Sequence, residues 1–183
     1  MEDLVRKLIE SVGEDPNRSG LEETPGRVAR MFSEILAGYN DDPSKYVKTF
    51  DVAEYDSLVL VKDIPFYSMC EHHMLPFFGK AHIAYIPDGK VIGLSKLARI
   101  LYAFSKRLQV QERITSQVAD FIQDALSPQG VAVALEAEHL CMIMRGVKAP
   151  GSLTVTSALR GAFVEDARAR GEVLALMGLN NSG

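Results

Sequence analysis

The chain has 183 residues, of which 47% are hydrophobic and 24% are charged, a composition typical of a soluble globular protein with one sizeable core. Twenty basic and twenty-four acidic residues give a net charge of −4, which argues against wholesale nucleic-acid binding and requires any anionic ligand to be held by a local cluster. No apolar run approaches the length of a membrane span, and the N-terminus starts acidic, unlike a signal peptide, so we expect a cytoplasmic protein without a membrane partner.

The chain opens with a region that we predict to be helical, followed by a linker. Apolar residues recur at helical spacing in residues 3–12 and again from Thr24 to Gly38. Arg27 and Arg30 project from the first turns of the second helix, and a solvated face is the simplest interpretation of them. The polar residues 39–56 read as a linker, so we predict two regions, 1–56 and 57–183.

The stretch Ser68–Pro76 contains one of the two cysteines and two of the four histidines in the chain. Cys70 and His73 have the C-x2-H spacing that lets a thiolate and an imidazole bind one metal ion from a turn. On a straight strand His73 would point away from Cys70. We therefore expect the chain to bend here between two strands, which leaves His72 free for other work.

The second cysteine ends a segment whose side chains alternate with a period of two. This pattern over residues 131–138 predicts a strand. Continuing its register places His139 and Cys141 on the same face as the buried valines, pointing the same way. A polar pair at the end of a core-facing row needs a partner.

Two thiolates and one imidazole would make three ligands for zinc, with a fourth position open for water as in catalytic sites. A closed structural site would need a fourth ligand, which His72 or His139 could provide, so the count alone does not decide. A disulfide is disfavoured because no secretory signal precedes the cysteines, whereas two buried free thiols are the ordinary alternative. The adjacent histidines favour the metal.

Two further helices carry charged residues in their first turns. The first begins at Ser95, and its cations Lys96 and Arg99 oppose the helix dipole. Free backbone amides and two cations would bind a phosphate, while a pair of solvated side chains is the alternative. The second helix spans about 110–126, and Glu112 in its first turn is most simply a residue that stabilises the helix dipole.

The order of predicted elements indicates the fold class. Two helices, two strands, two helices, two strands and a closing helix suggest an α+β protein whose antiparallel sheet is covered by helices on one side. Four strands cannot close a barrel and leave their edges exposed. We therefore expect several subunits to join edge to edge.

Four motifs, taken in chain order, point to a known family. They are Cys70-Glu71-His72-His73, Gly93-Leu94-Ser95-Lys96, Gln109-Val110-Gln111-Glu112-Arg113, and His139-Leu140-Cys141 followed by Arg145-Gly146. Together they closely resemble GTP cyclohydrolase I of the zinc-dependent type. The resemblance extends from about Glu23-Thr24-Pro25 to the last helix, and no motif covers the first twenty or so residues.

The resemblance implies a tunnelling fold, in which subunits join their sheets into a ring with an N-terminal helical extension. Two stacked pentamers would form a homodecamer with active sites between subunits and one zinc ion per subunit. The family converts GTP and water to 7,8-dihydroneopterin triphosphate and formate, the entry step to folate and other pterins.

The resemblance also implies roles for individual residues. The zinc ligands of the family match Cys70, His73 and Cys141, and its catalytic histidines match His72 and His139. The residues that hold the guanine edge match Glu112 and Gln111. The triphosphate and ribose pocket matches Ser95, Lys96, Arg99, Arg145 and Arg27, while Arg30 stands where related sequences carry lysine, a swap that keeps the charge but changes the geometry.

The expected chemistry suits these residue types. Purine C8 is a poor electrophile, so attack by water needs an activated nucleophile, which zinc supplies, and a protonated N7. We assign the protonation of N7 to His139, with His72 assisting proton transfers. Glu112 would accept two hydrogen bonds from the N1 and N2 edge of guanine, a contact that discriminates against adenine by on the order of 10⁴-fold.

Two rival classes remain open. Another tunnelling-fold enzyme would need either the three-histidine metal site of a pyruvoyl-tetrahydropterin synthase or the lone nucleophilic cysteine of a nitrile reductase, and the sequence shows neither pattern. The other rival is a ring without enzymatic activity that holds a structural zinc.

Overall fold

The computed structural model describes residues 1–51 and 55–179. By its internal contacts the chain forms two compact units, Met1–Ala37 and Gly38–Gly183. The predicted functional division after residue 56 stays a prediction.

The N-terminal unit contains the two helices that the sequence predicts, α1 (Glu2–Ser11) and α2 (Thr24–Ile35). Val5 and Ile9 are the buried residues of α1, and they follow the spacing of one helical face. Proline occupies the first turn of α2, where its missing N–H leaves no hydrogen bond unmade.

Part of the segment predicted as a linker is structured and belongs to the second unit. It contains two 3₁₀ turns, η1 (Ala37–Asn40) and η2 (Pro43–Tyr46), and the short strand β1 (Thr49–Asp51). β1 pairs antiparallel with β4 (Lys90–Ile92). Residues 52–54 of the predicted linker lie outside the described residues.

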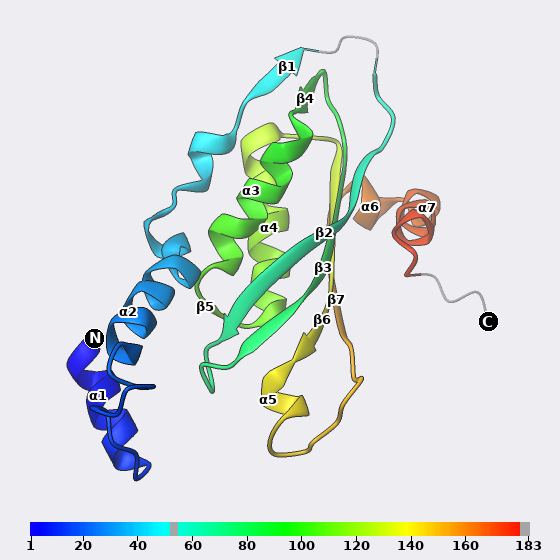
Figure 1. The fold of residues 1–183 in the computed structure, drawn as a ribbon. Helices are drawn as coiled ribbons and strands as arrows, with labels where there is room; N and C mark the ends of the chain where they lie inside the picture. Colours follow the sequence, from blue (N-terminus) through cyan, green and yellow to red (C-terminus); the bar gives the residue numbers. More distant parts are fainter. Residues whose placement is uncertain (52–54, 180–183) are drawn as a thin grey trace. The chain divides into compact units, whose positions relative to one another are not determined.

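The second unit is built on a mixed sheet of strand order β5-β2-β3-β6-β7 (Figure 1). Its long strands are antiparallel, and the two-residue β5 runs parallel to the end of β2. Each long strand pairs with its neighbour over most of its length. The bounds are β2 (Val59–Cys70), β3 (Pro76–Ile86), β5 (Leu108–Gln109), β6 (Gly130–His139) and β7 (Thr154–Gly161).

Two helices, α3 (Leu94–Ser105) and α4 (Gln111–Leu126), cover one face of this sheet (Figure 1). The large core side chains of β3 and β6 face these helices. On β6 they alternate with the small residues Ala132 and Ala134 on the other face, to which β3 contributes Ala84. This alternation produces the main core and a smaller second one.

The alanine face packs against the C-terminal helices α6 (Ala162–Glu165) and α7 (Ala167–Met177), which lie across the sheet from α3 and α4 (Figure 1). We predicted one closing helix. The chain instead breaks at Asp166, which adopts an extended conformation and caps α7 by accepting a hydrogen bond from the backbone N–H of Arg168.

The fold is therefore α+β with a predominantly antiparallel sheet and its main helical layer on one side, as predicted. Among the described residues, no helix combines the length and apolar character needed to cross a membrane.

Candidate active site

The predicted bend between Cys70 and His73 is confirmed. β2 ends at Cys70, a turn follows, and β3 starts at Pro76. The backbone N–H of Met74 donates to the Cys70 carbonyl at 2.8 Å, and the N–H of Cys70 donates to Leu75 O at 2.9 Å. Met74 takes the left-handed conformation with φ 53°, which lets the chain reverse direction within so few residues.

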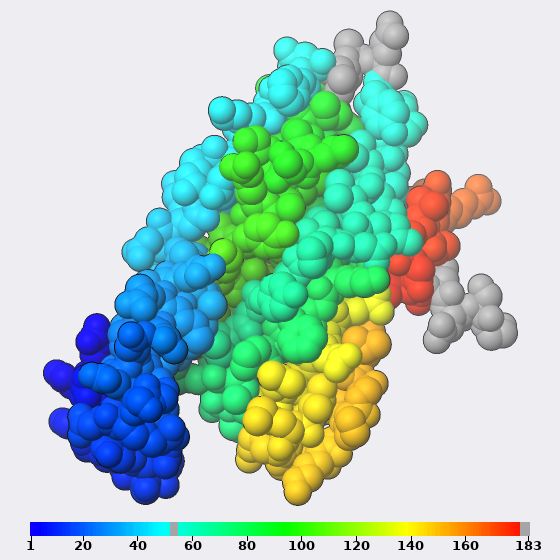
Figure 2. All heavy atoms as spheres, viewed as in Figure 1, coloured from blue at the N-terminus to red at the C-terminus, as the bar shows by residue number. Residues whose placement is uncertain are grey.

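Cys141 lies on a different kind of element from the one predicted. β6 ends at His139, and Cys141 belongs to the short helix α5 (Leu140–Ile143), so the expectation of one continuous strand face is wrong. The turn of α5 redirects the chain, so that Cys141 reaches the β2–β3 turn. In the space-filling view the yellow surface of this segment lies beside the green surface of that turn (Figure 2).

The three side chains predicted as metal ligands converge. The potential ligand atoms of Cys70, His73 and Cys141 all lie within 4.8 Å of one another. Both cysteines are free, Cys70 is buried, and His73 is exposed to solvent. Two sulfurs and one imidazole nitrogen at this spacing match a donor set that proteins use for zinc, and three protein ligands are typical of catalytic zinc sites.

The Cys141 thiol and the His73 imidazole each have a close polar neighbour. Burial raises the pKa of the Cys141 thiol, and the neighbouring Cys70 raises it further. Arg145 donates a hydrogen bond to His73 Nε2 at 2.9 Å, which places a guanidinium beside the cluster.

His139 lies at the end of β6, half-buried, in a defined orientation. Its ring stacks on Phe77, its partner in the strand register, with 4.6 Å between ring centroids and an interplanar angle of 4°. Its Nε2 is 2.8 Å from Gln111 Oε1. Burial lowers the pKa of His139, while the negative charge of nearby Glu112 acts in the opposite direction.

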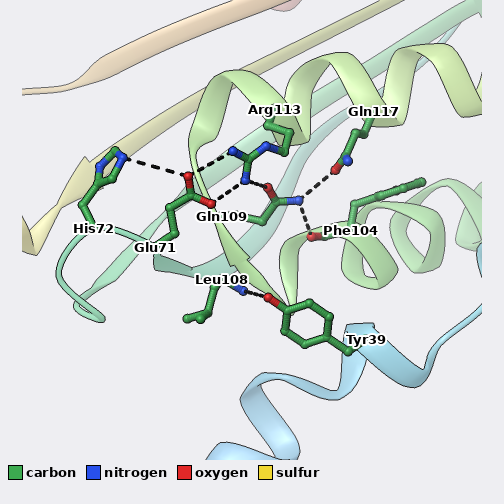
Figure 3. Close-up of polar contacts among 8 residues, drawn as sticks. All are labelled: Tyr39, Glu71, His72, Phe104, Leu108, Gln109, Arg113 and Gln117. Atoms are coloured by element: carbon green, nitrogen blue, oxygen red, sulfur yellow. Dashed lines mark hydrogen bonds and ion pairs between the residues drawn. The ribbon is translucent and has the colours of Figure 1, made fainter.

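His72 is exposed to solvent. Figure 3 shows its side chain beside the carboxylate of Glu71. Its Nε2 is 3.9 Å from Glu71 Oε1, and Arg113 binds Glu71 through both of its terminal nitrogens. These hydrogen bonds hold the pKa of Glu71 below its usual value. Arg113 also contacts the buried Gln109, so the turn is tied to the start of α4 (Figure 3).

The predicted phosphate-binding residues of α3 are separated from this cluster within one chain. The C-terminal end of α3 lies at β2, where Ser68 Oγ donates to Ser105 O at 2.7 Å. Ser95 and Lys96 lie in the first turn, at the other end of a 12-residue helix that is about 18 Å long, and Arg99 lies near the middle of this helix. Arg99 there stacks over the ring of Tyr46.

The remaining predicted residues are solvent-exposed. Glu112 lies in the first turn of α4, and its charge reaches His139. Arg27 and Arg30 belong to the N-terminal unit, where Arg27 forms an ion pair with Glu23. Arg30 lines a shallow hollow of that unit together with Glu2 and other charged residues.

Sequence reasoning assigned no role to Phe77, Glu71 or Arg113. Glu71 lies within the motif Cys70–His73, and Arg113 lies within the motif Gln109–Arg113. Their positions next to predicted site residues could have indicated a role for them. Phe77 carried no signal, because an aromatic residue on a strand is usually a core residue.

The arrangement defines a candidate metal-dependent enzyme, with three ligands from two distant segments and a further histidine beside each segment. The model of the GTP cyclohydrolase I family matches residues 1–178, so the match includes the N-terminal residues that no motif covered. This chain belongs to the GTP cyclohydrolase I family.

Relatives of high identity cover nearly the whole chain. GTP cyclohydrolase 1 of Carboxydothermus hydrogenoformans is 58% identical over 179 residues, which is 97% of this chain and 93% of the relative. The enzyme of the same name from Geobacillus kaustophilus is 60% identical over 178 residues, covering 97% and 95%. That of Bacillus subtilis is 58% identical over 175 residues, covering 95% and 92%.

Proposed function

We propose that this protein is a GTP cyclohydrolase I that opens the imidazole ring of guanine hydrolytically, converting GTP and water to 7,8-dihydroneopterin triphosphate and formate. This reaction is the first step of folate and pterin biosynthesis. The observation that carries the proposal is the convergence of Cys70, His73 and Cys141 in a chain that matches this family from residue 1 to 178.

Cys70, His73 and Cys141 would hold one zinc ion per subunit. Two thiolates and a neutral imidazole fit zinc better than the hard cations, which prefer oxygen ligands. When bound, zinc supplies a Lewis acid that activates water near neutral pH.

Around the metal, we assign proton transfers to the two remaining histidines. His139, held by Phe77 and Gln111, protonates N7 of the base and so makes C8 electrophilic. His72 assists from the exposed turn beside Glu71. Glu112 accepts hydrogen bonds from the N1 and N2 edge of guanine, which adenine lacks.

The triphosphate and the ribose would be bound by one hydroxyl and five cations. The family assigns this role to Ser95, Lys96, Arg99, Arg145, Arg27 and Arg30. Arg145 already contacts the cluster residue His73. Ser95 and Lys96 lie at the remote end of α3, which supports an active site completed by a second subunit. We accordingly propose a cytoplasmic homodecamer of two stacked pentamers whose sheets join edge to edge.

Formate release and the appearance of a pterin chromophore on incubation with GTP test this function, with bound zinc measured on the same sample. We expect about one zinc per subunit, and loss of formate release when a chelator removes the metal. If the protein binds zinc but leaves GTP intact, it is instead a ring without enzymatic activity that holds a structural zinc. Turnover without any bound metal would refute the assigned zinc centre.

A further inference from the structure

Gln111 is one of the most buried polar residues in the described part of the chain, with 1% of its surface exposed. It is the first residue of α4, and its side chain points into the sheet rather than to solvent. The amide nitrogen donates to Leu135 O and Thr154 O, both at 3.0 Å, and to Thr156 Oγ1 at 3.1 Å. Its two N–H groups are therefore shared among three acceptors on β6 and β7.

These contacts determine which way the amide faces. Rotating it by 180° would place its oxygen against two carbonyl oxygens and leave His139 facing an N–H group. The hydrogen bonds of two threonine hydroxyls are consistent with this orientation of the Gln111 amide. Thr115 donates to Gln111 O at 2.8 Å, so the hydrogen in its 2.7 Å contact with Thr156 comes from Thr156, whose lone pairs are left to accept from Gln111.

The amide oxygen of Gln111 consequently faces His139 Nε2 at 2.8 Å. An amide oxygen can only accept, so Nε2 carries a proton. The parallel stack on Phe77 holds the ring in the plane that this hydrogen bond requires.

We propose that Gln111 is a positioning residue that keeps the proton of His139 on Nε2, so that Nδ1 is the nitrogen that first takes up a proton from solvent and then gives it to N7 of the base. The inference rests on the proposed function and changes one assignment within it. The family resemblance places Gln111 with Glu112 at the guanine edge. The Gln111 amide, however, is buried, and both of its N–H groups are used inside the protein.

The test is ¹⁵N NMR of histidine-labelled, zinc-loaded enzyme without GTP, combined with steady-state kinetics. The His139 signals are assigned by their loss in His139→Asn. We expect the wild-type neutral ring to carry its proton on Nε2 alone. In Gln111→Met, which keeps the side-chain length but removes the acceptor, both tautomers should appear. kcat should fall roughly 10- to 100-fold, the range for outer partners of functional histidines, with the KM for GTP unchanged.

Gln123→Met is the matched control, since it makes the same exchange near the other end of α4, where Gln123 donates to Pro128 O. It should leave the His139 tautomer and kcat as they are. A wild-type ring protonated on Nδ1 would overturn the proposal without any variant. If Gln111→Met keeps a single His139 tautomer but has a raised KM for GTP, Gln111 binds the guanine edge and the proposal is wrong. If the wild-type protein shows the expected tautomer but releases no formate from GTP, the proposed function is wrong while the role of Gln111 in orienting His139 stands.

Discussion

Gly79 offers a sharp test of how the sheet positions the site. It lies in β3, paired with Phe66 on one side and Ala137 on the other, two residues from the pair of Phe77 and His139. A Cβ at this position would lie 1.9 Å from Glu136 O and 2.7 Å from Ala137 Cα. Both obstacles are backbone atoms, so no side chain can rotate away.

Gly79→Ala would force β3 and β6 apart locally by about 1 Å. That separation breaks about two ladder hydrogen bonds, each worth about 1 kcal/mol. Overpacking adds about 1–3 kcal/mol, so we expect a loss of about 3–5 kcal/mol in the free energy of unfolding, a large part of the roughly 5–15 kcal/mol typical of domains. The melting temperature should fall by roughly 10 °C.

Thermal unfolding followed by circular dichroism measures this change, with formate release assayed below the transition. Gly171→Ala on α7 is the control, because a Cβ there meets no atom within 4 Å. It should leave the melting temperature unchanged or raise it, since alanine favours a helix by about 1 kcal/mol over glycine. If Gly79→Ala melts within about 2 °C of wild type, the close approach of β3 and β6 is not rigid and the reasoning is wrong.

Four further substitutions test the site. Cys141→Ser replaces a soft ligand and should abolish bound zinc, measured by mass spectrometry, together with formate release; a fully active variant would remove Cys141 from the ligands. His139→Ala should retain zinc while turnover falls roughly 10²- to 10⁴-fold, whereas loss of the metal would identify a fourth ligand. Glu112→Ala should lose the preference for GTP over ATP, measured in competition, and Lys96→Ala should weaken GTP binding without changing that preference.

Local patterns in the sequence predicted the elements and the turn that carries the first ligands. The C-x2-H spacing required a bend between Cys70 and His73, and the structure has it. Helical periodicity likewise placed α3 and α4 within a residue or so. The prediction that Cys141 continues the strand of His139 was wrong, because the strand ends at His139 and a helix follows. That helix has only four residues, which are too few to leave a periodic pattern in the sequence.

The sequence by itself therefore determined the types of side chain available for metal and proton chemistry and the family to which the chain belongs. Only the tertiary structure decided that Gln111 faces His139, that Arg113 binds Glu71, and that Ser95 lies far from Cys70. The physical reason is that periodicity reports only the face on which a residue lies. Hydrogen-bond partners distant in the chain are set by the strand register and by the packing of α3 and α4 on the sheet.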